Sequence, residues 1–228
     1  MKFVSLFAGI GGIDYGLERA GHTCVGQVEI DPYCTRVLEK HWPHTPRIRD
    51  VKNFAGHEFG PFGLLAGGYP CQPFSHAGDQ QGASHEHHLW PEVERIIRVT
   101  RPRFVLLENV VGHLSIGFDQ VLADLAAIGY DATWDCIPAS AVGAPHQRDR
   151  LWVVAYPDSY SEPAEPVDVE ALWGAPPAGV RWPEWTPDPA TLGMDDGLPR
   201  GMDRRRVKAL GNAVVPAVAE LIGRRLPA

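Results

Sequence analysis

The fold of this chain is decided by residues 2–31, KFVSLFAGIGGIDYGLERAGHTCVGQVEID. Lys2–Phe7 is a short apolar run that predicts a strand, and the glycine-rich turn FAGIGG begins at its last residue. Ile13–Ala20 has helical spacing and stops at Gly21, and Thr23–Ile30 is a second β-rich run. A strand, a tight turn, a helix and another strand in this order are typical of the first unit of a doubly wound parallel sheet.

Two acidic side chains follow the strands of this unit. Glu29 ends the second strand, roughly 20 residues after the glycines, where a carboxylate typically binds ribose hydroxyls. Asp50 ends the candidate third strand and could accept a hydrogen bond from an adenine amino group. These features favour a nucleotide-type cofactor, because glycines let the backbone approach a ligand closely. A merely tight turn, a capping aspartate and a dinucleotide-binding oxidoreductase stay open as alternatives, although the turn has the form GxGG rather than GxGxxG.

The alternation of strands and helices continues to about residue 156. Strands are predicted at Arg47–Val51, Phe62–Ala66, Phe104–Leu107, Tyr130–Ile137 and Leu151–Ala155, and helices at Pro32–Trp42, Pro91–Thr100 and Phe118–Ala127. Strands that alternate with helices imply a parallel sheet that is covered on both faces. We therefore expect an α/β fold in which residues 1–156 form the catalytic domain.

The composition changes at Pro157. From there to Asp203 the chain is rich in proline, glycine, tryptophan and acidic residues, so residues 157–203 predict a short irregular insert. Its tryptophans, Trp173 among them, are interpreted as packing anchors rather than base-stacking probes. Order resumes over residues 204–215, and Pro216–Arg225 predicts a closing helix, so residues 204–228 are expected to return to the catalytic domain.

Length and composition narrow the function classes. A chain of 228 residues that is 44% hydrophobic can bury a substantial core. No stretch approaches the ~18 apolar residues of a membrane span, which predicts a cytoplasmic protein with no membrane partner. The net charge of −7 argues weakly against nucleic acid, but arginines cluster locally and phosphate contacts are local. The four cysteines form no CxxC pair and are expected to be reduced.

The segment GGYPCQPFS, residues 67–75, carries the strongest chemical signal. It places Cys71 between two prolines on a loop directly after a strand, where open α/β sheets bind their ligands. This context favours a reactive cysteine over a structural one. Glu108 directly follows the strand Phe104–Leu107, and Arg148 and Arg150 precede the strand Leu151–Ala155, facing one way if that backbone is extended. A thiol, an acid and two arginines are thus expected at one edge of the sheet.

Five segments in order resemble the motifs of DNA (cytosine-5) methyltransferases: FAGIGG, GGYPCQPFS, ENV, QRDR and ALGNAVVP. The resemblance runs from Phe3 to about Ala155 and from Arg204 to Arg225, and it omits only the insert. Amino-methylating enzymes have a [DN]PP[YF] loop in place of Pro-Cys-Gln. The resemblance, to the phage or bacterial type with a reduced target-recognition region, implies a class I S-adenosylmethionine-dependent methyltransferase fold. This Rossmann-like fold is a doubly wound, mostly parallel sheet with one antiparallel hairpin strand near its edge.

The resemblance also implies a role for each matching residue. Cys71 is similar to the nucleophile that adds to a flipped cytosine in double-stranded DNA, Glu108 to the residue that meets the base edge, and Arg148 and Arg150 to the basic pair. The positions implied to contact S-adenosylmethionine are Phe7, Gly9, Gly11, Glu29, Ile30, Asp50, Val51, Leu89 and Asn212. The positions expected to contact DNA are Gln72 and Ser75 of the catalytic loop, together with Arg204, Arg205 and Arg206.

Other functions stay open at this point. An RNA cytosine-5 methyltransferase would share the motifs, whereas Cys71, Glu108 and Arg150 argue against a non-catalytic nucleic-acid-binding module. A nicotinamide-dependent oxidoreductase has no use for Pro-Cys-Gln or ENV. A metal site at His85–His88 is disfavoured, since no distant Cys/His set has ligand spacing. We expect a monomer, and a specificity partner or a cognate endonuclease is left open.

Overall fold

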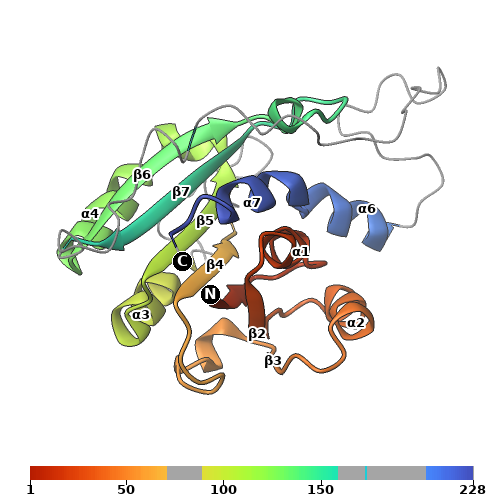
Figure 1. Cartoon of the computed structure of the whole chain (residues 1–228), viewed down its shortest axis with the longest axis horizontal. Coiled ribbons are helices and arrows are strands. Elements are labelled where there is room, and N and C mark those ends of the chain that lie inside the picture. Colours follow the sequence, from red (N-terminus) through yellow and green to blue (C-terminus); the bar gives the residue numbers. More distant parts are fainter. Residues whose placement is uncertain (71–88, 159–172, 174–203, 228) are drawn as a thin grey trace.

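A computed structural model describes residues 1–70, 89–158, 173 and 204–227 (Figure 1). Its described strands form one sheet in the order β3-β2-β1-β4-β5-β7-β6. The strands are β1 (Lys2–Leu6), β2 (Thr23–Val28), β3 (Arg47–Ile48), β4 (Leu64–Gly68), β5 (Phe104–Val110), β6 (Tyr130–Ile137) and β7 (Arg150–Pro157). Strands β3, β2, β1, β4 and β5 are parallel neighbours, and β7 runs antiparallel between β5 and β6. The expected doubly wound sheet with one antiparallel hairpin strand is confirmed.

The helices cover both faces of this sheet. They are α1 (Gly12–Arg19), α2 (Pro32–His41), α3 (Trp90–Thr100), α4 (Phe118–Ala127), α6 (Arg204–Asn212) and α7 (Pro216–Gly223), with short 3-10 turns at η1 (Val51–Asn53), η3 (Val111–Ser115) and η4 (Ala139–Val142). Helices α1 and α7 pack against one face, and α3 and α4 against the other. In Figure 1, α6 extends from the start of α7 toward the side of the molecule that carries α2.

Successive strand residues fill two separate cores. Phe3 and Leu64 pack with α1 and α7, whereas their neighbours Val4 and Leu65 pack with α3 and α4, and all four side chains are fully buried. Side chains alternate between the two faces of a strand, so a nearly continuous apolar run supplies both cores.

Several strand ends differ from the sequence-based expectation. β1 stops at Leu6, because Phe7 has a φ of 52° and already belongs to the turn. β3 is only Arg47–Ile48, since the Asp50 side chain caps the turn η1 that follows. β5 runs on to Val110 because β7 pairs with it along its whole second half, so Glu108 lies inside the strand rather than after it.

The first and last helices are in close contact. A Cβ atom built on Gly16 of α1 would lie 2.7 Å from the Ala219 Cβ of α7. Arg19 and Glu220 form an ion pair of 2.6 Å across the same interface. Glycine at position 16 therefore lets two helices from opposite parts of the chain pack backbone to backbone.

Two smaller findings bear on the sequence-based expectations. Trp173 packs against the core beneath α7 and donates a 2.9 Å hydrogen bond to the Thr133 hydroxyl, which confirms its role as a packing anchor. The rest of residues 159–203 lies outside the described part of the chain, so the boundaries of the insert stay a prediction. No helix in the described ranges has both the length and the apolar character needed to cross a membrane.

Candidate active site

The glycine-rich turn joins β1 to α1 through three left-handed residues, Phe7, Gly9 and Gly11, with φ values of 52°, 57° and 86°. A Cβ atom on Gly9 would have no neighbour closer than the Phe7 carbonyl oxygen at 4.0 Å, so the space beside this backbone is open. A Cβ atom on Gly11 would clash with the Trp42 ring, and one on Gly12 would lie 2.8 Å from the Val214 carbonyl oxygen. Gly9 therefore fits a close approach by a ligand, whereas Gly11 and Gly12 are required by packing.

Glu29 is connected directly to this turn. Its carboxylate accepts hydrogen bonds from the Gly9 N–H at 2.6 Å and from the Asp31 N–H at 2.7 Å. Burial raises the pKa of Glu29, and these two backbone hydrogen bonds oppose that rise. The carboxylate thus lies beside the open backbone of Gly9, where a ribose hydroxyl could be bound.

The remaining cofactor candidates are less uniform. Ile30 is an apolar side chain that is 63% exposed next to Glu29, and Leu89 is half-buried just before α3. Asp50 accepts a 3.0 Å hydrogen bond from the Lys52 N–H, so the capping role that the sequence left open is present. Val51 is only 4% exposed within the core that α3 covers, whereas Asn212 is exposed at the end of α6.

Glu108 is the buried acid of the site. Its Oε1 atom lies 2.9 Å from Nε of Arg150 at the start of β7. On the neighbouring strand, a Cβ atom on Gly68 would lie 2.7 Å from Oε2, so a larger residue there would displace this carboxyl group from its position. Burial raises the pKa of Glu108 to about 7, and Arg150 and then Arg148 oppose the rise. Glu108 can therefore exist in either protonation state near neutral pH.

Arg148 and Arg150 have different orientations and different partners. Its φ of 42° breaks the extended backbone that would have pointed both arginines the same way, so that expectation was wrong. Its guanidinium donates to the carbonyl oxygens of Gly211 and Ala213 at 2.6 and 2.5 Å. Arg148 thereby holds the turn on either side of Asn212, and it connects the Glu108 end of the site to the cofactor end.

Two functional candidates were missed by sequence reasoning: Tyr69 and His113. The Tyr69 hydroxyl lies 2.7 Å from Nε2 of His113, and Nδ1 of His113 lies 2.9 Å from the Ile116 carbonyl oxygen. Because a carbonyl only accepts, Nδ1 carries the proton and Tyr69 donates to Nε2. The Asn109 side chain donates a 3.4 Å bond to the Tyr69 carbonyl. The backbone two residues before Cys71 is thus anchored to the segment that follows Glu108.

The cysteines of the described ranges are poor nucleophiles. Cys24, Cys34 and Cys136 are free thiols, which confirms the reduced state for these three. Burial raises the pKa of each, that of Cys34 to about 12, so all three stay protonated near neutral pH.

Some predicted residues lie outside the described part of the chain. They are Cys71, Gln72, Ser75 and the His85–His88 cluster, together with the side chain of Arg204. Arg205 and Arg206 are exposed on α6. Among the described residues, no group of histidine, cysteine and acidic side chains could hold a metal ion.

Comparison with known proteins gives concordant results. Residues 1–172 match the family model of C-5 cytosine-specific DNA methylase. The type II methyltransferase M.NgoMIV of Neisseria gonorrhoeae is 38% identical over 71% of this chain and 54% of its own length. M.BsuFI of Bacillus subtilis is 30% identical over 90% of this chain and 53% of its own. The chain thus spans about half the length of these curated relatives.

Solved structures share the fold. A DNA modification methyltransferase encoded within an E. coli prophage is 27% identical with a TM-score of 0.59, over 70% of this chain and 47% of that one. The Entamoeba histolytica methyltransferase EhMeth has a TM-score of 0.67 at 14% identity, over 99% of this chain and 97% of that one. At that identity the second likeness concerns the fold alone.

Proposed function

Because the chain belongs to the C-5 cytosine-specific DNA methylase family, we propose that it transfers a methyl group from S-adenosylmethionine to carbon 5 of a flipped cytosine in double-stranded DNA. The observation that carries this proposal is the buried pair of Glu108 and Arg150 beside Gly68. Gly68 begins the short segment that leads to Cys71, so the acid, the arginine and the loop of the nucleophile share one edge of the sheet.

The described residues fit the proposed cofactor. Gly9 leaves open space beside a left-handed backbone, Glu29 presents a carboxylate there, and Ile30 offers an exposed apolar surface. Asn212 lies on the turn that Arg148 holds and that packs against Gly12. When bound, S-adenosylmethionine supplies an electrophilic methyl group. The chain's own part at this end is to bind and orient that group through Glu29, Asn212 and the turn.

The reaction at the base needs a nucleophile and an acid. The Cys71 thiolate adds to carbon 6 of cytosine, and the electron pair of the broken double bond moves through the ring toward N3 and carbon 5. Glu108 in its protonated form donates its proton to N3, while Arg150 stabilises the negative charge that develops on O2. Carbon 5 thereby becomes nucleophilic. After methylation a base such as water takes the carbon 5 proton, the Cys71 thiolate leaves from carbon 6, and N3 returns its proton to Glu108, which restores the ring.

The target base must leave the helix for this reaction. Neither face of carbon 6 is accessible in a stacked duplex, so the cytosine has to be flipped into the site. Glu108 meets the base edge that Watson–Crick pairing occupies in the duplex, which gives it access only to a flipped base. The buried position of Glu108 agrees with a site that encloses the base.

The covalent adduct provides the test. A duplex with 5-fluorocytosine at the target should trap the enzyme, because fluorine at carbon 5 cannot leave as a proton. We expect an adduct that survives denaturation, requires S-adenosylmethionine and disappears in Cys71→Ala. Cys136→Ala, which removes another free and partly exposed thiol, is the matched control and should still be trapped.

Two outcomes would contradict the proposal. An adduct in Cys71→Ala would exclude Cys71 as the nucleophile. Nucleoside analysis after incubation with labelled cofactor and either DNA or RNA identifies the substrate. If 5-methylcytosine forms in RNA alone, the substrate is RNA and not DNA.

A further inference from the structure

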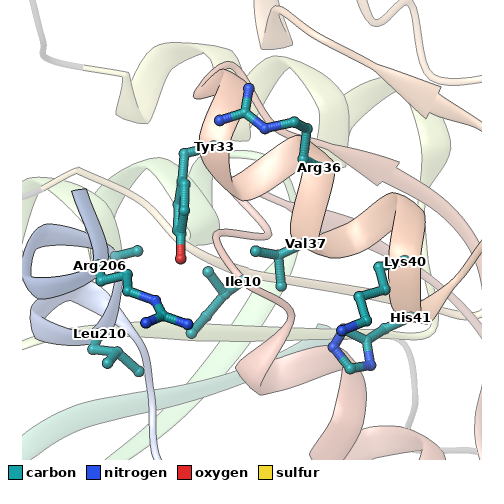
Figure 2. A pocket seen from close by; sticks show the side chains of 9 residues that line it. Ile10, Tyr33, Arg36, Val37, Lys40, His41, Arg206 and Leu210 are labelled. Atoms are coloured by element: carbon teal, nitrogen blue, oxygen red, sulfur yellow. The ribbon is translucent and has the colours of Figure 1, made fainter. Parts of the chain in front are cut away.

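A groove separates α2 from α6 on the cofactor side of the molecule (Figure 2). Its volume is about 510 Å³, and we refer to it as the α2–α6 groove. Its lining includes the cationic side chains Arg36 and Lys40 of α2 and Arg206 of α6, with His41 beside them. Ile10 and Leu210 contribute to an apolar floor, and no acidic residue of the described ranges lines the groove.

The cations of this groove are concentrated by helix geometry. Arg36 and Lys40 lie one turn apart, so they project from the same side of α2. Figure 2 shows Arg206 extending from α6 toward the space that Lys40 and His41 border from α2. Positive charge therefore approaches the groove from both helices, in a protein whose overall net charge is −7.

Arg36 and Lys40 differ from the cations of α3. On α3, Arg95 and Arg98 are paired with Glu92 and Glu94 of their own helix. Arg36 and Lys40 form no ion pair with any residue in the described ranges. The only acid between them on α2, Glu39, is exposed and does not line the groove, so the cations on the groove side are available to an external anion.

The floor of the groove adds to its affinity for an anion. Leu210 is 38% exposed, although it is a large apolar side chain, and Ile10 is half-buried. Apolar groups next to cations reduce the local screening by water, which strengthens the attraction for phosphate. They also offer contact surface to a sugar, so the groove suits a chain of alternating phosphates and sugars better than a small free anion.

The groove adjoins the proposed active site. Ile10 belongs to the glycine-rich turn at the carboxyl end of β1. α6 ends at Asn212, in the turn that Arg148 holds two residues before Arg150. The groove therefore borders the same edge of the sheet as the catalytic groups, where a duplex bound at Glu108 would pass.

We propose that the α2–α6 groove binds the sugar-phosphate backbone of the DNA substrate on one side of the target base. This inference rests on the proposed function and adds a binding site to it. Arg36, Lys40 and Arg206 bind successive phosphates, and Ile10 and Leu210 contact deoxyribose. Such contacts position the duplex without reading its sequence.

The test neutralises two charges within the groove and two elsewhere. The groove variant is Arg36→Gln with Lys40→Gln. The control variant is Lys2→Gln with Arg98→Gln, which changes the net charge equally but alters the amino end of β1 and the outside of α3. Equilibrium binding to a duplex of about three helical turns is measured over a range of salt concentrations.

We expect the groove variant to bind this duplex at least about tenfold more weakly than wild type, and its salt slope to fall by about two units. The loss should be equal for all sequences. The loss of affinity should vanish when the duplex is shortened to about one helical turn, which contains only the target region. S-adenosylmethionine affinity and the rate at saturating DNA should match wild type, because neither residue belongs to the catalytic or cofactor groups.

Phosphate ethylation locates the contact. Ethylation of backbone phosphates on one flank should interfere with binding of the wild-type protein and no longer matter for the groove variant. If both double variants bind the long duplex alike, the inference is wrong, and an acidic protein segment becomes the better occupant. Another outcome is that the wild type forms no 5-methylcytosine while the groove variant, unlike the control variant, loses duplex binding. In that case the proposed function fails and the groove assignment stands. If the wild type binds no duplex, both fail.

Discussion

At the scale of single residues, Glu108 determines how the site responds to pH. Burial raises the pKa of its carboxyl to about 7 from an ordinary value of 4.5, even though Arg150 lies close enough to favour the ionised form. Desolvation therefore outweighs the ion pair. A carboxyl group that is half protonated near neutral pH suits a proton donor to N3 of cytosine.

The raised pKa has a cost in stability that can be measured. The contribution of the Glu108 carboxyl to the free energy of unfolding is fully present below pH 4.5. It is lost as the pH rises through about 7, where the buried group has to ionise. Glu108→Gln cannot ionise, so above pH 7 it should be more stable than wild type by on the order of 2–3 kcal/mol. Thermal unfolding at pH 8 and pH 5 checks this, and the advantage should disappear at the lower pH.

The exposed Glu39 serves as the control, since Glu39→Gln should show no such pH dependence. Glu108→Gln should at the same time form adduct far more slowly, because an amide donates no proton to N3. A stability difference that stayed constant between pH 5 and pH 8 would contradict the assignment of the shift to Glu108.

At the scale of elements, different glycines of the glycine-rich turn serve packing and ligand binding. A Cβ atom on Gly11 would clash with Trp42, whereas one on Gly9 would meet open space. Both residues have positive φ, so alanine costs about 1 kcal/mol at either position. Gly11→Ala should destabilise the fold by several kcal/mol in total, whereas Gly9→Ala should mainly weaken S-adenosylmethionine binding.

Chemical denaturation and calorimetry distinguish these two effects. The prediction requires that Gly9→Ala lose no more than about 1 kcal/mol of stability while its cofactor affinity falls. Equal loss of stability in both variants would show that Gly9, too, serves packing.

The anchoring of Tyr69 by His113 gives a second prediction at this scale. Tyr69→Phe removes one hydroxyl from a buried pair and leaves the ring against Trp90, with centroids 5.5 Å apart. We expect the fluorocytosine adduct to form about tenfold more slowly, as a loop misplaced by a small distance would cause. Cofactor affinity should not change, because the hydroxyl that is removed bonds to His113 and not to a cofactor candidate.

The double variant Tyr69→Phe with His113→Leu separates positioning from stability. It removes both partners of the Tyr69–His113 bond but also the donor to the Ile116 carbonyl oxygen, so it should regain none of the rate of adduct formation and at most the part of the stability that the unpaired Nε2 costs. If the rate of adduct formation recovered along with stability, the Tyr69–His113 pair would serve packing and not the positioning of the loop.

The order of the elements could be predicted from the sequence, whereas contacts between distant segments could not. The alternation of apolar runs was enough to predict the order of strands and helices and the edge at which Glu29 and Glu108 lie. It could not predict that Glu108 lies within β5, because the length of β5 depends on pairing with β7, which starts about 40 residues later along the chain. Local patterns also cannot show that Arg148 turns toward Gly211, since that contact spans 63 residues.

At the scale of the whole molecule, the short interval between the two halves of the catalytic domain bears on specificity. Residues 157–203 are acidic except for Arg181 and Arg200, and acidic side chains repel phosphate. We therefore expect this stretch to contribute little base readout and the purified protein to methylate a short or relaxed motif. Mapping of methylated sites on random-sequence duplexes measures this directly.

A strict motif of six or more base pairs would contradict this prediction. Methylation that requires added lysate would instead favour a partner that supplies specificity.

The contact between α1 and α7 also has a consequence for how the protein is made. Arg19 and Glu220 are 201 residues apart, so a ribosome that adds about 5–20 residues per second needs roughly 10–40 s to bring the second helix to the first. Throughout that interval the apolar side of α1 stays in water, and the turn at Gly12 lacks the Val214 backbone that packs against it. A helix that is made early is thus protected late, and slow translation of the segment between α1 and α7 would favour aggregation over folding.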